Sequence, residues 1–267
     1  MIRSDFHCHT LYCDGKDSPE DMVRSALEKG LAAVGISGHS YAPFDPGCQG
    51  MTPENEAKYR RQISRLKKKY EGQIRIFCGT EQDIFSPAPV KPFDYSIGSV
   101  HYLKTGDGYI SVDDTIDILR RLRDEYFGGD IYALCAAYYE TVSFVCKVTG
   151  SDIIGHFDLI SKFNEDGSLF DAQDPRYRSA WMSAADELLK ADVPFEINTG
   201  AMSRGYRTEP YPSQEIIRYI SGKGGRFVLS SDAHRKEDLT FGFERALEIL
   251  NGLGIEPVDP LYLIENK

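Results

Sequence analysis

The 267-residue chain lacks several features that mark particular classes of protein. Its six cysteines form no Cys-x-x-Cys pair and no regular framework, so the sequence indicates free buried thiols rather than a thiolate zinc site or disulfides. No stretch approaches the roughly 18 apolar residues of a transmembrane helix, so no membrane contact is expected. The chain does not open with a charged segment followed by an apolar run. We therefore expect no secretory signal and a cytoplasmic location.

Positive charge and nucleotide-binding motifs are also scarce. Lys and Arg number 31 against 41 Asp and Glu, which gives a net charge of −10. A protein that grips a nucleic-acid backbone needs clustered Lys and Arg, so no nucleic-acid partner is expected. No Gly-x-Gly-x-x-Gly follows the first strand and no P-loop sequence occurs, which disfavours a nucleotide site of either kind.

The chain does contain a regular alternation of short β-rich runs and amphipathic helices. The segments 18–30 and 52–72 each begin with a Ser or Thr N-cap followed by proline, which is typical of a helix start. Further helices are expected at 113–127, 131–149, 176–191, 213–223 and 242–252. Seven strands are expected at 2–6, 32–37, 74–81, 94–100, 152–156, 194–198 and 226–231.

Such alternation implies parallel strands with helices packed outside them. No linker, repeat or low-complexity segment divides the chain, so we expect a single domain over residues 1–267. The pattern alone leaves an open doubly wound sheet and a closed barrel as alternatives, and it selects no oligomeric state.

Residues that can bind a metal follow six of the seven predicted strands. A single histidine at a strand end is more often structural than a ligand, but here all six histidines of the chain lie at strand ends. Because the carboxyl ends of parallel strands meet on one face, we expect these side chains to lie together. The residues are His7, His9, His39, Glu81, His101, His156, Asp232 and His234.

The spacing and chemistry of this set favour metal ions. His7 and His9 are two residues apart on an extended segment, so both side chains point to one face. Glu81 has two oxygens and could bridge two ions about 3.5–4 Å apart. Ligands of this type suit Zn, Fe or Mn, and the set is too large for one tetrahedral ion. Two to three divalent ions are therefore expected, with Asp14 either a further ligand or part of an Asp-Gly turn.

These motifs resemble those of the PHP (polymerase and histidinol phosphatase) family. They are DFHCHT with CDG, GHS at 38–40, GTEQD at 79–83, GSVHYL at 98–103, GHFD at 155–158 and SSDAH at 230–234. The runs SIGSVHYL and EINTGA…EPYPS most resemble histidinol-phosphate phosphatases. The resemblance implies a distorted (β/α)7 TIM-like barrel with three metal ions at its C-terminal face.

The resemblance also implies a ligand set for each ion. The first ion would take His7, His9, Glu81 and Asp232, the second Glu81, His101 and His156, and the third His39, His234 and Asp14. Phosphatases of this family often carry histidine in the loop where this chain has Asp14. An aspartate can also ligate, so the third site would either persist with an altered metal preference or leave the centre with two tightly bound ions and one loose ion.

The reaction expected from this site is hydrolysis of a phosphomonoester, most simply L-histidinol phosphate to L-histidinol and phosphate in histidine biosynthesis. A metal-bridging hydroxide would be the nucleophile. Glu81, Asp232 and His234 are the candidate catalytic residues. A metal-bound water, Asp232 or His234 would protonate the leaving alkoxide.

A small phosphate ester as substrate calls for cations beside the metals. Arg204 and Arg207 follow the sixth predicted strand and are candidates for phosphate binding, with Lys162 as a third. Histidinol also carries an amine and an imidazole, for which acidic residues at the mouth of the site would be useful. The candidates are Asp45, Asp83 and Glu209.

Three other functions are compatible with the motifs. A phosphoesterase acting on nucleotides or oligonucleotides is disfavoured by the acidic balance, and a phosphotyrosine phosphatase is a second alternative. A non-catalytic scaffold with a decayed metal site would have lost ligands, whereas this chain retains essentially the full set.

Overall fold

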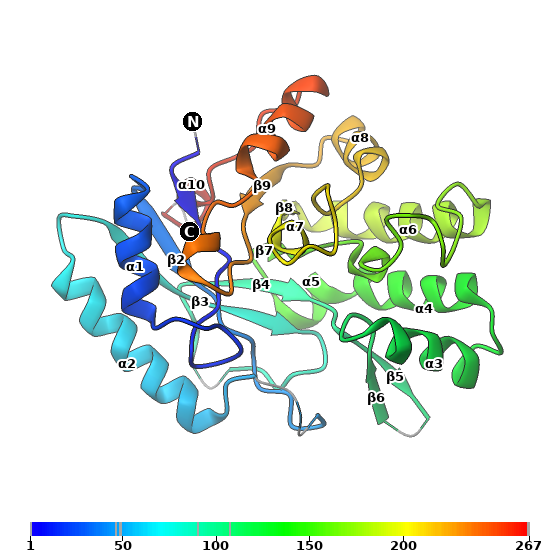
Figure 1. Cartoon of the computed structure of the whole chain (residues 1–267), viewed down its shortest axis with the longest axis horizontal. Helices are drawn as coiled ribbons and strands as arrows, with labels where there is room; N and C mark the ends of the chain where they lie inside the picture. Colours follow the sequence, from blue (N-terminus) through cyan, green and yellow to red (C-terminus); the bar gives the residue numbers. More distant parts are fainter. Residues whose placement is uncertain (1, 46, 48–49, 90, 107, 266–267) are drawn as a thin grey trace.

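A parallel seven-stranded sheet forms the centre of the computed structural model, which describes residues 2–45, 47, 50–89, 91–106 and 108–265. In sheet order the strands are β1 (Ser4–Asp5), β2 (Ala33–Ile36), β3 (Arg75–Asp83), β4 (Tyr95–Ser99), β7 (Ile153–Ile154), β8 (Phe195–Asn198) and β9 (Phe227–Ser230). Beyond β1 and β9, Cys8 forms a parallel bridge to Ala233, and the backbone N of His9 donates to Ala233 O at 2.8 Å. The sheet is thus a nearly closed barrel, and the predicted TIM-like α/β fold is confirmed (Figure 1).

Helices surround this barrel. They are α1 (Pro19–Glu28), α2 (Pro53–Lys69), α3 (Ile116–Tyr126), α4 (Ile131–Ser143), α5 (Val145–Thr149), α6 (Pro175–Leu188), α7 (Gly200–Ser203), α8 (Gln214–Gly222), α9 (Phe243–Gly252) and α10 (Pro260–Glu265). The predicted starts of α1 and α2 are confirmed, because Ser18 and Thr52 accept hydrogen bonds from the backbone N–H of the third residue of each helix. Among the described residues, no helix combines the length and apolarity that crossing a membrane requires.

Two local predictions were wrong, and one pair of strands was missed. The single helix expected over 131–149 is divided at Phe144 into α4 and α5. Strand β3 continues through Asp83, so Glu81 lies within a strand rather than at its end. An antiparallel hairpin of β5 (Tyr102–Thr105) and β6 (Gly108–Ser111) was not predicted, and it projects beside α3 (Figure 1). The five described cysteines are free as expected, although Cys13 and Cys146 are only partly buried; Cys48 lies outside the described residues.

The N-terminal end of the barrel is filled by aromatic side chains and covered by α10. Phe6 and Tyr95 are buried there against Leu261 and Ile264 of α10. The Tyr95 ring lies so close to Gly79 that a Cβ at this position would be 2.2 Å from a ring carbon. Because this end is packed, the opposite end of the barrel is the one available for a site.

Candidate metal centre

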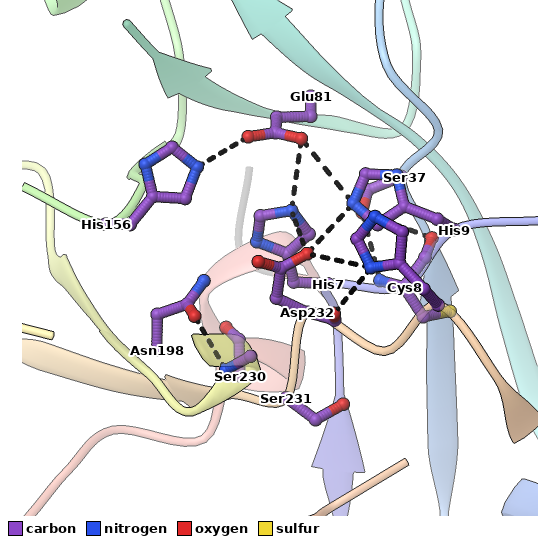
Figure 2. A network of polar contacts seen from close by, with 12 residues as sticks. His7, Cys8, His9, Ser37, Glu81, His156, Asn198, Ser230, Ser231 and Asp232 are labelled. Carbon is purple, nitrogen blue, oxygen red and sulfur yellow. Dashed lines mark hydrogen bonds and ion pairs between the residues drawn. The ribbon is translucent and has the colours of Figure 1, made fainter. Parts of the chain in front are cut away.

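Glu81 is at the middle of the polar residues that gather at the C-terminal end of the barrel. Its side chain is 1% exposed. Its Oε2 lies 2.8 Å from His39 Nδ1 and 3.3 Å from His7 Nε2. Its Oε1 lies 2.7 Å from His156 Nε2 and 3.2 Å from His101 Nε2. Figure 2 shows His156 on one side of this carboxylate and His7 and His9 on the other, so the two oxygens face two different groups of ligands.

Electrostatics keep Glu81 ionised. Burial alone would raise the pKa of Glu81, but the surrounding histidines, His39 first, hold that pKa well below its usual range. The opposite holds for His9, where burial together with His234 and His39 lowers the pKa to about 3. At pH 7 His9 is therefore a neutral imidazole, the form that binds a metal.

Asp232 forms a second centre of contacts. Its Oδ1 lies 3.1 Å from His9 Nε2 and 3.6 Å from His7 Nε2. The residue has a φ of 48°, a left-handed backbone conformation that is uncommon for residues other than glycine. Arg204 holds it there, with Nη1 donating to the Asp232 carbonyl and Nη2 to Oδ2, both at 3.1 Å. Gly200 leaves the space that this carboxylate needs, since a Cβ there would lie 2.6 Å from Oδ2.

Asp14 joins the same group from the loop after β1. Its Oδ2 lies 2.8 Å from His234 Nε2, and its Oδ1 lies 3.5 Å from His9 Nδ1 and 3.7 Å from His39 Nε2. The turn interpretation also holds, because residues 11–14 form a turn. Asp14 is therefore both part of a turn and directed at three histidines.

The donor set fits divalent cations. Four buried atoms of this set, all of them nitrogen or carboxylate oxygen, have no hydrogen-bond partner: His7 Nε2, His9 Nε2, Asp14 Oδ1 and Glu81 Oε2. Unpaired buried polar atoms are costly, and a bound cation would satisfy several of them at once. Three groups of side chains have ligand atoms within 4.8 Å of one another: His9, Asp14, His39 and His234; His7, His9 and Asp232; and His39, Glu81 and His101.

These groups overlap with the ligand sets that the family resemblance implies. Asp14, His39 and His234 fall together, as do His7, His9 and Asp232. His9 takes part in two groups, and His156 lies outside all three although it contacts Glu81. The assignment of each side chain to a particular ion therefore remains a prediction.

A pocket of about 800 Å³ opens over the centre. Arg204 and Lys162 line it, and Arg204 Nη1 lies 2.9 Å from His234 Nδ1. Lys162 Nζ donates to Asp113 O at 2.5 Å and lies 3.3 Å from Asp113 Oδ2. Asp45 and Asp83 line the pocket as well. These positions suit binding of an anionic group next to the metal ligands.

Two predicted substrate contacts lie elsewhere. Arg207 is not among the residues that line the pocket. Its Nη1 donates to Ser161 Oγ at 2.8 Å and to Ser161 O at 3.2 Å, so it fastens one loop to another. Glu209 is likewise absent from the lining and is paired with Arg245 at 2.6 Å.

Buried carboxylates behind the histidines were missed from the sequence. Glu196 in β8 lies with Oε1 2.6 Å from His7 Nδ1. Asp5 in β1 accepts hydrogen bonds from Ser231 N at 3.2 Å and Thr240 N at 3.0 Å. The signal was present, because each is a charged residue inside a short strand predicted to be buried.

The geometry agrees with comparisons to known proteins. The PHP domain model matches residues 5–200. A probable histidinol-phosphatase of Deinococcus radiodurans is 29% identical over 262 residues, which cover 94% of this chain and 93% of the relative. The histidinol-phosphatase of Bacillus subtilis is 26% identical over 273 residues, covering 93% of this chain and 99% of that protein.

A solved structure extends the similarity to the fold. Histidinol phosphate phosphatase from Lactococcus lactis, solved with Zn, L-histidinol and phosphate, superposes with a TM-score of 0.72 at 19% identity. The superposition covers 96% of this chain and 95% of that one. With the family model matched from before His7 to beyond Glu196, the chain belongs to the PHP domain family.

Proposed function

We propose that this protein is a metal-dependent phosphomonoester hydrolase that converts L-histidinol phosphate and water to L-histidinol and phosphate. The observation that carries the proposal is the gathering of all six histidines around Glu81, Asp232 and Asp14, with four of the histidines lining one pocket. Support for the substrate comes from relatives named for this activity and from the zinc, histidinol and phosphate held by the Lactococcus structure. The reaction would belong to histidine biosynthesis.

Two to three divalent ions, Zn, Fe or Mn, would be held by Glu81 and the eight side chains around it. When bound, such ions supply positive charge that makes water more acidic and neutralises phosphoryl oxygens. The ligand residues are His7, His9, Asp14, His39, Glu81, His101, His156, Asp232 and His234.

The residues of the pocket would bind and orient the phosphate ester. Arg204, whose side chain is 29% exposed, is the foremost candidate for the phosphate because it lies beside His234 and Asp232. Lys162 lies across the pocket with its charge partly used by Asp113. Asp45 and Asp83 are the candidates for the amine or imidazole of histidinol.

A water molecule at the centre is our candidate for the group that protonates the leaving alkoxide. His234 lines the pocket, but its Nδ1 accepts a hydrogen bond from Arg204 and its Nε2 would hold an ion, so it has no proton to give. Asp232 is fully ionised in this setting, since burial would raise its pKa but Arg204 and His7 hold that pKa well below its usual range. An ionised carboxylate has no proton to donate, so Asp232 suits charge stabilisation better than acid catalysis.

We also propose that residues 1–267 form one metallophosphoesterase domain. The alternatives are a PHP phosphoesterase acting on nucleotides or oligonucleotides and a phosphotyrosine phosphatase. No described feature of the pocket favours either of them.

The deciding experiment is kcat/KM for histidinol phosphate, nucleoside monophosphates, a short oligonucleotide and a phosphotyrosine peptide, with Mn, Fe and Zn each added back. We expect histidinol phosphate to exceed every other substrate by about 100-fold, because a site built for specific polar groups rejects substrates that lack them. Metal-replete protein that hydrolyses none of the phosphomonoesters would refute the proposal.

A further inference from the structure

Glu196 is an ionisable side chain in the wall of the barrel, where no water reaches it. It lies in β8, between Phe195 and Ile197, and its exposed fraction is 0%. A buried carboxylate is costly unless every oxygen has a partner. The partners of Glu196 therefore indicate its role.

Both oxygens of Glu196 are used, and they serve different strands. Oε1 lies 2.6 Å from Nδ1 of His7, which follows β1. Oε2 accepts hydrogen bonds from the backbone N–H of His156, which follows β7, and from Asn198 Nδ2, both at 2.9 Å. One carboxylate thus connects the ring of one candidate ligand with the backbone of another that lies 149 residues further along the chain.

The contact with His7 determines which nitrogen of that ring faces the metal centre. A carboxylate only accepts, so Nδ1 carries a proton, and in the neutral ring that binds a metal the lone pair is then on Nε2. This Nε2 lies 3.3 Å from Glu81 Oε2 and 3.6 Å from Asp232 Oδ1, and it has no hydrogen-bond partner. Three acceptors that face each other in a buried space are the arrangement that a cation would stabilise.

We propose that Glu196 is a positioning residue that fixes the tautomer of His7 and the backbone of His156, and so sets two candidate metal ligands with one carboxylate. The inference rests on the metal centre of the proposed function, but not on the identity of the substrate. When a group that hydrogen-bonds to a metal-binding histidine is replaced, the metal affinity commonly falls by roughly 10- to 100-fold.

Zinc affinity tests the inference without any substrate. We would compare wild type, Glu196→Gln and Glu196→Asp by competition with a chromogenic zinc chelator, with Glu187→Gln on the exposed surface as the matched control. The amide of Glu196→Gln must turn its NH2 toward either His7 Nδ1–H or His156 N–H. Two hydrogen-bond donors then face each other, and one hydrogen bond is lost. We expect its zinc Kd to rise about 10- to 100-fold, with a smaller rise for Glu196→Asp and none for the control.

A second measurement needs no variant and covers the case in which Glu196→Gln does not fold. Nitrogen-15 NMR of the imidazoles in zinc-loaded wild type should show His7 protonated at Nδ1. A proton on Nε2, or an unchanged zinc affinity in folded Glu196→Gln, would overturn the inference. Inactivity of zinc-loaded wild type toward histidinol phosphate would instead contradict the proposed function and leave this inference standing.

Discussion

The two carboxylate oxygens of Glu81 contact most of the histidines of the centre. Its Oε2 faces His7, His9 and His39, and its Oε1 faces His101 and His156. These five histidines come from four different segments of the chain, and no other described side chain contacts all of them. A single carboxylate is therefore positioned to share charge between two groups of ligands, as a bridging ligand must.

The two arginines of the loop after β8 differ in the use of their guanidinium groups. Arg204 reaches the centre, whereas Arg207 bonds Ser161 and lies over the Tyr211 ring at 4.7 Å. We expect Arg204→Lys to lower kcat/KM for histidinol phosphate about 10- to 100-fold, the size of one lost charge-assisted hydrogen bond.

Arg207→Lys is the matched control for this change. It should leave kcat/KM within about twofold while lowering Tm slightly, since only a contact between loops is lost. Steady-state kinetics and thermal melting of both variants give the answer. If Arg207→Lys has the larger effect on kcat/KM, our placement of the phosphate contact is wrong.

At the scale of elements, most of the candidate ligands follow the ends of strands, and Glu81 lies within the nine-residue strand β3. Strands β1 and β7 contain two residues each, and turns follow them at residues 11–14 and 157–158. Such turns require residues without side chains where one part of the backbone passes close to another. Gly15, next to Asp14, is the most crowded example among the described residues.

Gly15→Ala should therefore damage both stability and metal binding. The added Cβ would lie 2.3 Å from Thr10 N and 2.4 Å from His9 C, and these are backbone atoms that cannot turn aside. We expect a loss of roughly 1–3 kcal/mol in unfolding free energy, typical of overpacking, and weaker zinc binding because Asp14 must move. Denaturant unfolding and zinc competition measure the two effects.

Gly222→Ala provides the comparison for this variant. A Cβ there meets nothing within 4 Å and the residue is the last of helix α8, so stability should hold or rise by up to about 1 kcal/mol. Equal unfolding free energies for the two glycine variants would show that the turn at Asp14 tolerates a side chain.

For the whole molecule, the centre joins segments from both ends of the chain. His9, His39 and His234 belong to one group of ligand atoms, although more than half of the chain separates the first from the last. The barrel is closed by the bridge between Cys8 and Ala233, each of which is next to a candidate ligand. Because an ion that binds here binds only the folded barrel, its binding free energy adds to the stability of the whole fold.

Chelation should accordingly lower the melting temperature. Zinc at a hundredfold excess over its Kd would contribute about 2.7 kcal/mol, which corresponds to a shift of roughly 5–10 °C for a domain of this size. The fluorescence of Trp181, which is the one tryptophan of the chain and is 1% exposed, would follow the transition with and without EDTA. His9→Ala should respond much less to EDTA, and an equal response in both proteins would contradict the link between centre and fold.

The sequence by itself determined the elements and the list of candidate ligands. Apolar runs between helix caps located all seven strands of the barrel, because such patterns depend only on residues that are near one another in the chain. The position of every histidine at a strand end then predicted a single polar cluster. The same local patterns could not find the β5–β6 hairpin or the interruption at Phe144.

The tertiary structure alone decided which histidines contact the same oxygen of Glu81, which arginine reaches the pocket, and which buried carboxylate contacts the candidate ligands. Arg204 and Arg207 are three residues apart and have equal chemistry, yet one contacts Asp232 and the other Ser161. In the sequence, Glu196 is a single charged residue within a strand predicted to be buried. Its contact with His7 exists because closure of the barrel brings β8 close to the residues that follow β1. Those outcomes depend on distances of a few ångströms between segments remote in sequence, and such distances are set only when the barrel closes.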